Sequence, residues 1–112
     1  MSARGETWLW LLQRASAAVL ALAVLVHLAT IIYATRHGLS AAAILGRTAG
    51  NHWWLGFYLL FAAAAALHAG IGVRVILREM TAWHGRSLDL AAMLLALGTL
   101  ALGWRAAFGL FA

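Results

Sequence analysis

Two histidines lie inside hydrophobic stretches of the sequence that are long enough to cross a lipid bilayer. His27 lies in LALAVLVHLATII, and His68 lies in LLFAAAAALHAGIGVRVIL. Because an ionisable group at membrane depth is costly, such residues usually face the interior of a helical bundle and mark a functional site. A neutral imidazole is also a common axial ligand of haem iron. The two positions therefore predict iron-ligating side chains, His27 and His68, and a haem b cofactor.

The composition is that of a membrane protein. Of the 112 residues, 65% are hydrophobic and 10% are charged, and the mean hydropathy is +0.91, whereas a soluble domain carries about 25% charged residues. The net charge of +5 comes from arginines that flank the apolar runs, which is typical of membrane-end anchors in contact with lipid and not of a nucleic-acid interface. With no cysteine, disulfides, thiolate-bound iron–sulfur clusters and covalent haem attachment are excluded.

Three stretches of the chain exceed the roughly 20 residues that are needed to cross about 30 Å of hydrocarbon. They are expected to form helices at about 8–35, 53–77 and 88–111. In the connections, Ser40 is expected to cap a short interfacial helix, and Ser87 to cap the third span. The chain, residues 1–112, is therefore expected to be one all-α membrane domain with three transmembrane helices.

The arginines are divided unequally between the two ends of the predicted spans. Five are expected at the end that holds the N-terminus, and three at the other. Since arginine and lysine are more frequent in cytoplasmic loops, this predicts a cytoplasmic N-terminus in the inner membrane of a bacterium. At 1.5 Å per residue, His27 is expected nearer the outer face and His68 nearer the cytoplasmic half, about 10–15 Å apart in depth. Such a separation predicts two levels of ligands and not one shared iron.

Two short elements resemble the membrane-anchor subunits of succinate dehydrogenase and fumarate reductase, the complex II family. Residues Gln13–Ser16 (QRAS), at the start of the first span, resemble the family's Q/H-R-x-S/T element. Residues His68–Arg74 (HAGIGVR), followed by Glu79, resemble its H-x-x-x-G-x-R-x-x-x-x-D element in the second span. The resemblance covers about two thirds of the chain. Its specificity comes from the order, spacing and helix placement of the two elements together.

The resemblance implies a cytochrome b anchor that passes electrons between an iron–sulfur subunit and membrane quinone, in a complex that also contains a flavoprotein subunit. His68 matches the family's axial haem ligand. Arg14 and Ser16 match polar positions near the quinone pocket, and Glu79 stands where the family has an aspartate near that pocket. Trp10 either belongs to the interfacial tryptophan belt or forms a wall of the quinone pocket.

Several of these residues have a purely structural alternative. Arg74 and Arg78 lie one helical turn apart, a spacing that suits haem propionates and lipid phosphates equally well. Arg14 could be an interfacial arginine that extends to the membrane surface, and Glu79 could pair with a loop arginine. A membrane histidine can also hydrogen-bond a neighbouring helix without any cofactor.

The first-span histidine departs from the pattern of single-haem anchors. Di-haem relatives have a histidine in the first and second spans of each half of a longer chain, at a spacing similar to the 41 positions between His27 and His68. This chain is one half of such a design, so a second anchor chain is expected, and an identical copy is favoured over a sister subunit. In that homodimer, His27 would pair with its mate around an outer haem, and His68 with its mate around an inner one.

Two other classes of function stay open. One is a cytochrome b anchor of a different flavoprotein dehydrogenase, and the other is a haem-free membrane subunit for assembly or packing. The sequence shows no nucleophile with a base, no phosphate-binding loop and no zinc-ligand spacing. Electron transfer and quinone binding within an oxidoreductase complex are therefore expected of this subunit, and not bond-making catalysis.

Overall fold

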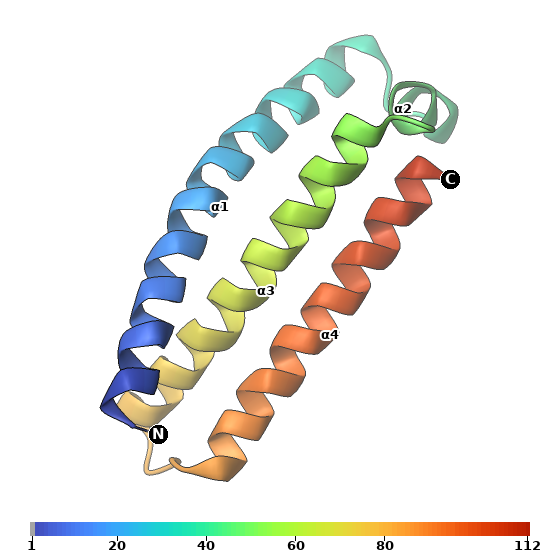
Figure 1. Ribbon diagram of the computed structural model, residues 1–112. Coiled ribbons are helices and arrows are strands. Elements are labelled where there is room, and N and C mark those ends of the chain that lie inside the picture. Colours follow the sequence, from blue (N-terminus) through green and yellow to red (C-terminus); the bar gives the residue numbers. More distant parts are fainter. Residues whose placement is uncertain (1) are drawn as a thin grey trace.

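The computed structural model describes residues 2–112. They form four helices, with no strand among them: α1 (Ala3–His37), α2 (Ala41–Thr48), α3 (His52–Met80) and α4 (Arg86–Phe111). The long helices α1, α3 and α4 are apolar enough to cross a membrane, and they run up, down and up through the bundle (Figure 1). The predicted all-α fold with three membrane spans is therefore confirmed.

Each long helix begins before the position expected from the apolar pattern, because polar residues cap or continue the helical backbone. α1 begins at Ala3, where Ser2 Oγ accepts a hydrogen bond from the Gly5 amide at 3.1 Å. α3 begins directly after Asn51, whose Oδ1 accepts from the amides two and three residues further on. Such caps satisfy amides that have no partner within the helix.

The two caps expected in the connections have different outcomes. Ser40 caps α2 as predicted, since its Oγ accepts from the Ala43 amide at 3.1 Å. The prediction for Ser87 is wrong, because α4 begins at Arg86, directly after Gly85, so that Ser87 already lies inside the helix. Ser87 Oγ instead accepts from Trp83 Nε1 at 2.8 Å. Gly85 suits the position before the helix because its φ of +88° lies in the region that favours glycine.

Helix α3 is the centre of the bundle, with α1 on one side and α4 on the other. It packs tightly along α4 because small residues face each other. A Cβ added to Gly70 would lie 2.9 Å from Ala96 Cβ, and one added to Gly103 would lie 2.6 Å from Ala62 Cβ. Small residues at helix contacts let backbones approach closely in membranes. The α3–α4 pair is therefore the close-packed part of the chain.

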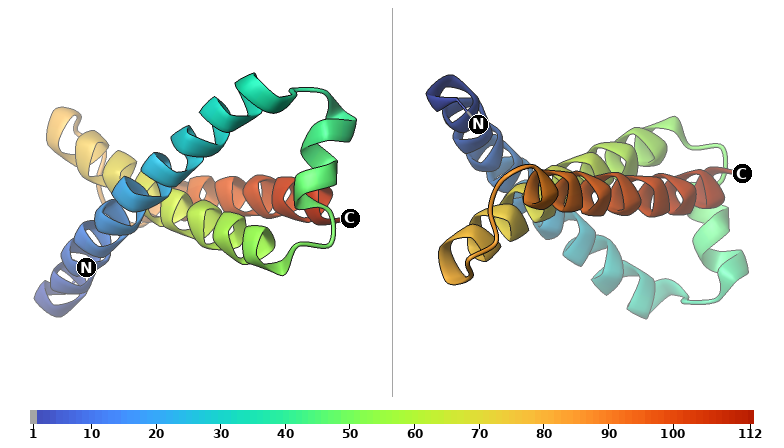
Figure 2. Two further views of the ribbon diagram at one scale, coloured as in Figure 1. Left: turned by 90° about the horizontal axis from the view of Figure 1, so that it is seen from above. Right: turned by 90° about the horizontal axis from the view of Figure 1, so that it is seen from below.

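Helix α1 crosses α3 at an angle, as Figure 2 shows, so the two separate on both sides of the crossing, and one of the two ends holds α2. We call this the α2 end, and the opposite one, where α1 begins, the N-terminal end. At the α2 end, Thr48 Oγ1 donates to the Leu110 carbonyl at 2.9 Å, and the Gly50 amide donates to the Phe111 carbonyl at 2.9 Å. These bonds fix the end of α2 to the C-terminal turn of α4.

The bundle is long enough to pass through a bilayer, with a longest extent of 49 Å against about 30 Å of hydrocarbon. Its outward faces are apolar: Leu22 and Leu25 on α1, and Leu94 and Leu102 on α4, are each more than 60% exposed. Such faces are suited to lipid or to a partner helix and not to water.

Candidate functional site

The structure places the two membrane histidines at two different levels of the contact between α1 and α3. His68 Nδ1, on α3, lies 3.4 Å from Ser16 Oγ on α1. His27 Nδ1, on α1, lies 3.3 Å from the Tyr58 hydroxyl on α3. Ser16 and His27 are separated by three helical turns of α1, which corresponds to about 16 Å at 1.5 Å per residue. Each level therefore contains one imidazole from this chain.

At the level of His68, the neighbouring hydroxyl is buried and already bonded. Ser16 is only 4% exposed, and its Oγ donates to the Gln13 carbonyl at 3.0 Å. The Gln13 side chain lies beside Gly72, where an added Cβ would be 3.2 Å from Nε2, and its buried Oε1 has no hydrogen-bond partner among the described residues. The absence of a side chain at Gly72 thus gives Gln13 room against α3, one turn away from His68.

At the level of His27, aromatic side chains surround the imidazole. Its ring makes edge-on contacts with Tyr58, at 5.7 Å between centroids, and with Phe61, at 5.4 Å. The same region opens into a groove of about 850 Å³ between α1, α2 and α3, which His27, Tyr58 and Trp54 line together with apolar residues. Arg47 of α2 also lines this groove, so one cationic side chain lies on an otherwise mostly apolar wall.

Tyr58 was not predicted from the sequence as a neighbour of His27. A signal for it exists, because Tyr58 lies one turn before Phe61 and so extends the stripe on α3 that leads to His68. What the sequence does not provide is the register of α1 against α3. That register decides which position on one helix faces which position on the other.

Arg74 and Arg78 meet carboxylates from two other helices at the N-terminal end. Arg74 is buried, and it pairs with Glu6 of α1 at 2.9 Å and with Asp89 of α4 at 2.7 Å. Arg78, which is more exposed, pairs with the same Glu6 at 3.0 Å. We call these four residues the ionic cluster. It joins α1, α3 and α4, so the structure uses both arginines to hold helices together.

Glu6, the partner of both arginines, and Asp89, the partner of Arg74, were not predicted from the sequence. Each lies in the first turn of its helix, where a carboxylate also interacts favourably with the helix dipole. Both carboxylates lie in the first turn of a helix, and both helices begin at the end of the bundle where α3 carries its two arginines. This shared position is the signal that could have identified them.

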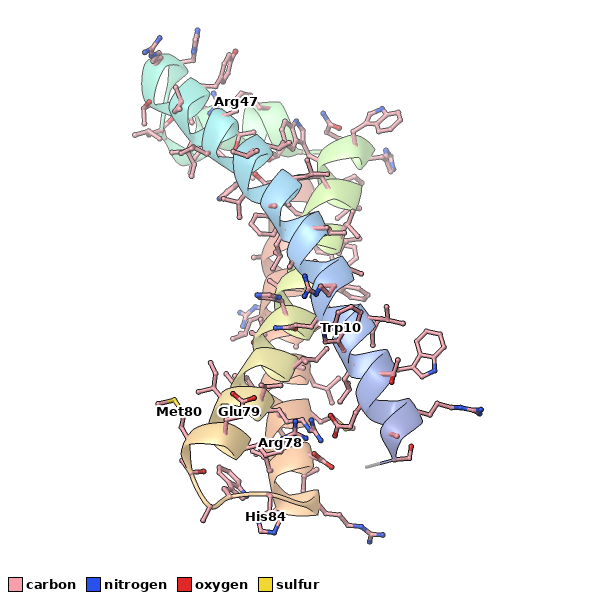
Figure 3. All side chains as sticks on the ribbon, turned by 90° about the vertical axis from the view of Figure 1, so that its left-hand side faces the viewer. Trp10, Arg47, Arg78, Glu79, Met80 and His84 are labelled. Atoms are coloured by element: carbon pink, nitrogen blue, oxygen red, sulfur yellow. The ribbon has the colours of Figure 1, made fainter. Side chains whose placement is uncertain are left out.

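The four residues expected at a quinone site do not gather in this chain. Arg14 stacks over the Trp10 ring at 4.8 Å, and both side chains are exposed on α1. Ser16 is buried and faces His68. Glu79 is exposed at the end of α3, well away from Trp10 (Figure 3), and it is not among the acids that form ion pairs within residues 2–112.

Each level offers one imidazole as a possible metal ligand. Within the described chain, residues 2–112, no group of three or more His, Cys, Asp or Glu side chains could hold a metal ion. A porphyrin supplies four equatorial nitrogens and leaves two axial positions for protein ligands such as imidazole. One imidazole at each level could therefore serve as one protein ligand of a haem, and at the level of His27 aromatic side chains lie beside it.

These features define a multi-pass helical membrane protein with one histidine at each of two levels. The family model of the succinate dehydrogenase/fumarate reductase transmembrane subunit matches residues 1–106. The chain belongs to this family, and the resemblance that was predicted from two short elements is confirmed over almost its full length. Comparisons with curated proteins and with solved structures gave no match.

Proposed function

We propose that this chain is a haem b-binding membrane anchor of a succinate:quinone oxidoreductase-type complex. In this role it would attach the iron–sulfur and flavoprotein subunits to the membrane and connect the iron–sulfur subunit to quinone. The observation that carries the proposal is the placement of His27 and His68. Both are intramembrane histidines at the α1–α3 contact, and each has its Nδ1 against a hydroxyl of the opposite helix.

Two imidazoles at separate levels call for a second anchor chain. An identical copy related by a two-fold axis along the membrane normal keeps every residue at its own depth, because rotation about that axis moves nothing along it. His27 would then lie at the level of the partner copy's equivalent residue, and His68 likewise. Isologous interfaces of this kind are the commonest in homo-oligomers. The symmetry therefore favours a homodimer with two haem sites.

The groove at the α2 end supports a site at the outer level. Its volume of about 850 Å³ lies within the roughly 300–1,000 Å³ that is usual for ligand and cofactor pockets. A haem iron with two imidazole ligands supplies one-electron transfer. In this chain, His27 would hold the iron, Trp54 and Tyr58 would exclude water, and Arg47 would provide positive charge near the propionates.

The quinone end is proposed at the N-terminal end of the bundle, on the cytoplasmic side of a bacterial inner membrane. Arg14 and Trp10 form an exposed cation–π pair there, and Glu79 is exposed on α3. Because these groups do not form a closed pocket in one chain, we expect the iron–sulfur subunit to complete it. Arg14 would then orient the quinone carbonyl by charge, and Glu79 would place a carboxylate near the end of α3.

The proposal is tested by reduced-minus-oxidised absorption spectra of the purified complex. We expect a haem b spectrum in the wild type and a clear loss of intensity in His68→Ala. His52→Ala is the matched control, because His52 is an exposed histidine at the start of the same helix, and it should leave the spectrum unchanged. A wild-type complex without haem would contradict the proposal and would favour the haem-free packing subunit.

A further inference from the structure

We infer that Ser16 is a positioning residue for His68, with its hydroxyl accepting a hydrogen bond from Nδ1–H so that Nε2 presents its lone pair for iron. The inference rests on the proposed haem function. It goes beyond that function because it gives Ser16 a role at the histidine in place of the expected role in the quinone pocket. It is based on the two hydrogen-bond contacts of Ser16 Oγ, one with the Gln13 carbonyl and one with His68 Nδ1.

The direction of the bond follows from counting protons. A serine hydroxyl has one proton to donate and lone pairs that accept. Of the two contacts of Ser16 Oγ, the one with the Gln13 carbonyl is the shorter, at 3.0 Å against 3.4 Å to His68 Nδ1. We therefore assign the Ser16 proton to the carbonyl, which leaves the same oxygen to accept from Nδ1. Nδ1 must then carry the proton. In a neutral imidazole, a proton on Nδ1 leaves Nε2 unprotonated, which is the form that ligates a metal.

The surroundings of Ser16 make this arrangement stable. The residue is 4% exposed, and among residues 2–112 it is the side chain within hydrogen-bond distance of the His68 ring. A buried hydroxyl costs free energy unless it is hydrogen-bonded. Because α1 carries Ser16 at the level of His68, the pair also fixes the orientation of the ring. Partners of this kind orient metal-ligating histidines and raise their basicity.

His27 provides the contrast within the same chain. Its Nδ1 lies 3.3 Å from the Tyr58 hydroxyl, which has no other hydrogen bond among the described residues. The Tyr58 proton is therefore free to point towards Nδ1 or away from it, and proton counting does not fix the tautomer of His27. Only at the level of His68 does the neighbouring hydroxyl impose the iron-binding form.

The test uses the purified complex and follows the haem itself. Redox titration with optical detection and low-spin electron paramagnetic resonance would be measured for the wild type, Ser16→Ala and Ser16→Thr. Thr35→Ala is the matched control, because Thr35 lies on the same helix and donates to the carbonyl three residues earlier, at 2.7 Å, but has no histidine partner. It should behave as the wild type.

Ser16→Ala should raise the midpoint potential of one haem, because an imidazole without an acceptor at Nδ1–H is a weaker donor to ferric iron. It should also weaken haem retention by about 10–100-fold, the usual effect of removing a partner of a metal-ligating histidine. Ser16→Thr, which keeps the hydroxyl, should restore both. An unchanged potential and retention in Ser16→Ala, with haem still lost in His68→Ala, would overturn this inference alone. A wild-type complex without haem would overturn it together with the proposed function.

Discussion

The two ends of the α1–α3 pair are built in opposite ways. At the N-terminal end, the ionic cluster of Glu6, Arg74, Arg78 and Asp89 holds α1, α3 and α4 together around a buried guanidinium. Helices α1 and α3 separate from their crossing towards both ends (Figure 2), and at the α2 end a groove of about 850 Å³, which α2 also lines, lies between them. The difference indicates a division of roles: the first end fixes helix positions near His68, and the second leaves space beside His27.

Filling the groove should produce the largest effect on cofactor content. Ala34 lines the groove on α1, so Ala34→Trp would place an indole where the outer haem is proposed. We expect about half of the haem to be lost, with the His68 level retained. The measurement is the haem-to-chain ratio of the purified protein. Ala21→Trp, at an exposed position on the same helix outside the groove, is the control. Equal ratios in the two variants would show that the groove holds no haem.

Breaking the ionic cluster should produce the largest effect on stability. The Arg74 side chain is 8% exposed, and those of its partners Glu6 and Asp89 are 35% exposed. Arg74→Ala is expected to cost about 2–3 kcal/mol, less than a fully buried pair because the remaining carboxylates are partly solvated. The free energy of unfolding can be measured by denaturation in detergent.

Arg78→Ala provides the comparison for that measurement, because the Arg78 side chain is 39% exposed and makes a single ion pair with Glu6. Surface pairs contribute about 0–1 kcal/mol. If Arg78→Ala destabilised the protein as much as Arg74→Ala, the burial of Arg74 would not be the source of the stability at this end.

A smaller effect is expected where α3 and α4 touch closely. Gly70→Ala would place a Cβ 2.9 Å from Ala96 Cβ and 3.2 Å from the Ala92 carbonyl oxygen. Overpacking of this kind costs about 1–3 kcal/mol. Gly56→Ala, on the same helix with nothing within 4 Å of the added atom, should be neutral or stabilising. The opposite order of the two melting temperatures would mean that α3 and α4 do not pack as described.

The sequence was sufficient for features that depend on one segment at a time. Long apolar stretches predict spans because backbone groups in lipid must be bonded within a helix, and Ser40 caps α2 through a contact three residues away. Helix ends were less certain: Ser87 has the right residue type for a cap, but Gly85 provides the backbone conformation that ends the turn before α4.

Contacts between helices could not be predicted in the same way, because they depend on the register and rotation of one helix against another. Ser16 and His68 were both recognised as candidate site residues, but their contact at 3.4 Å joins two elements that the sequence treats separately. Arg74 was likewise recognised without Glu6 and Asp89. The amino-acid pattern therefore identifies candidate residues one at a time, but it does not predict which of them meet across two helices.

The most direct test of the account is the ratio of haem b to chain, measured by pyridine haemochrome in the purified complex for the wild type, His27→Ala and His68→Ala. A homodimer with a haem at each level predicts one haem per chain in the wild type. About half of that should remain in each variant. The haem that remains in His27→Ala should differ in midpoint potential from the haem that remains in His68→Ala. One haem per two chains, lost in His68→Ala and unaffected in His27→Ala, would contradict the two-level arrangement and leave His27 as a packing residue.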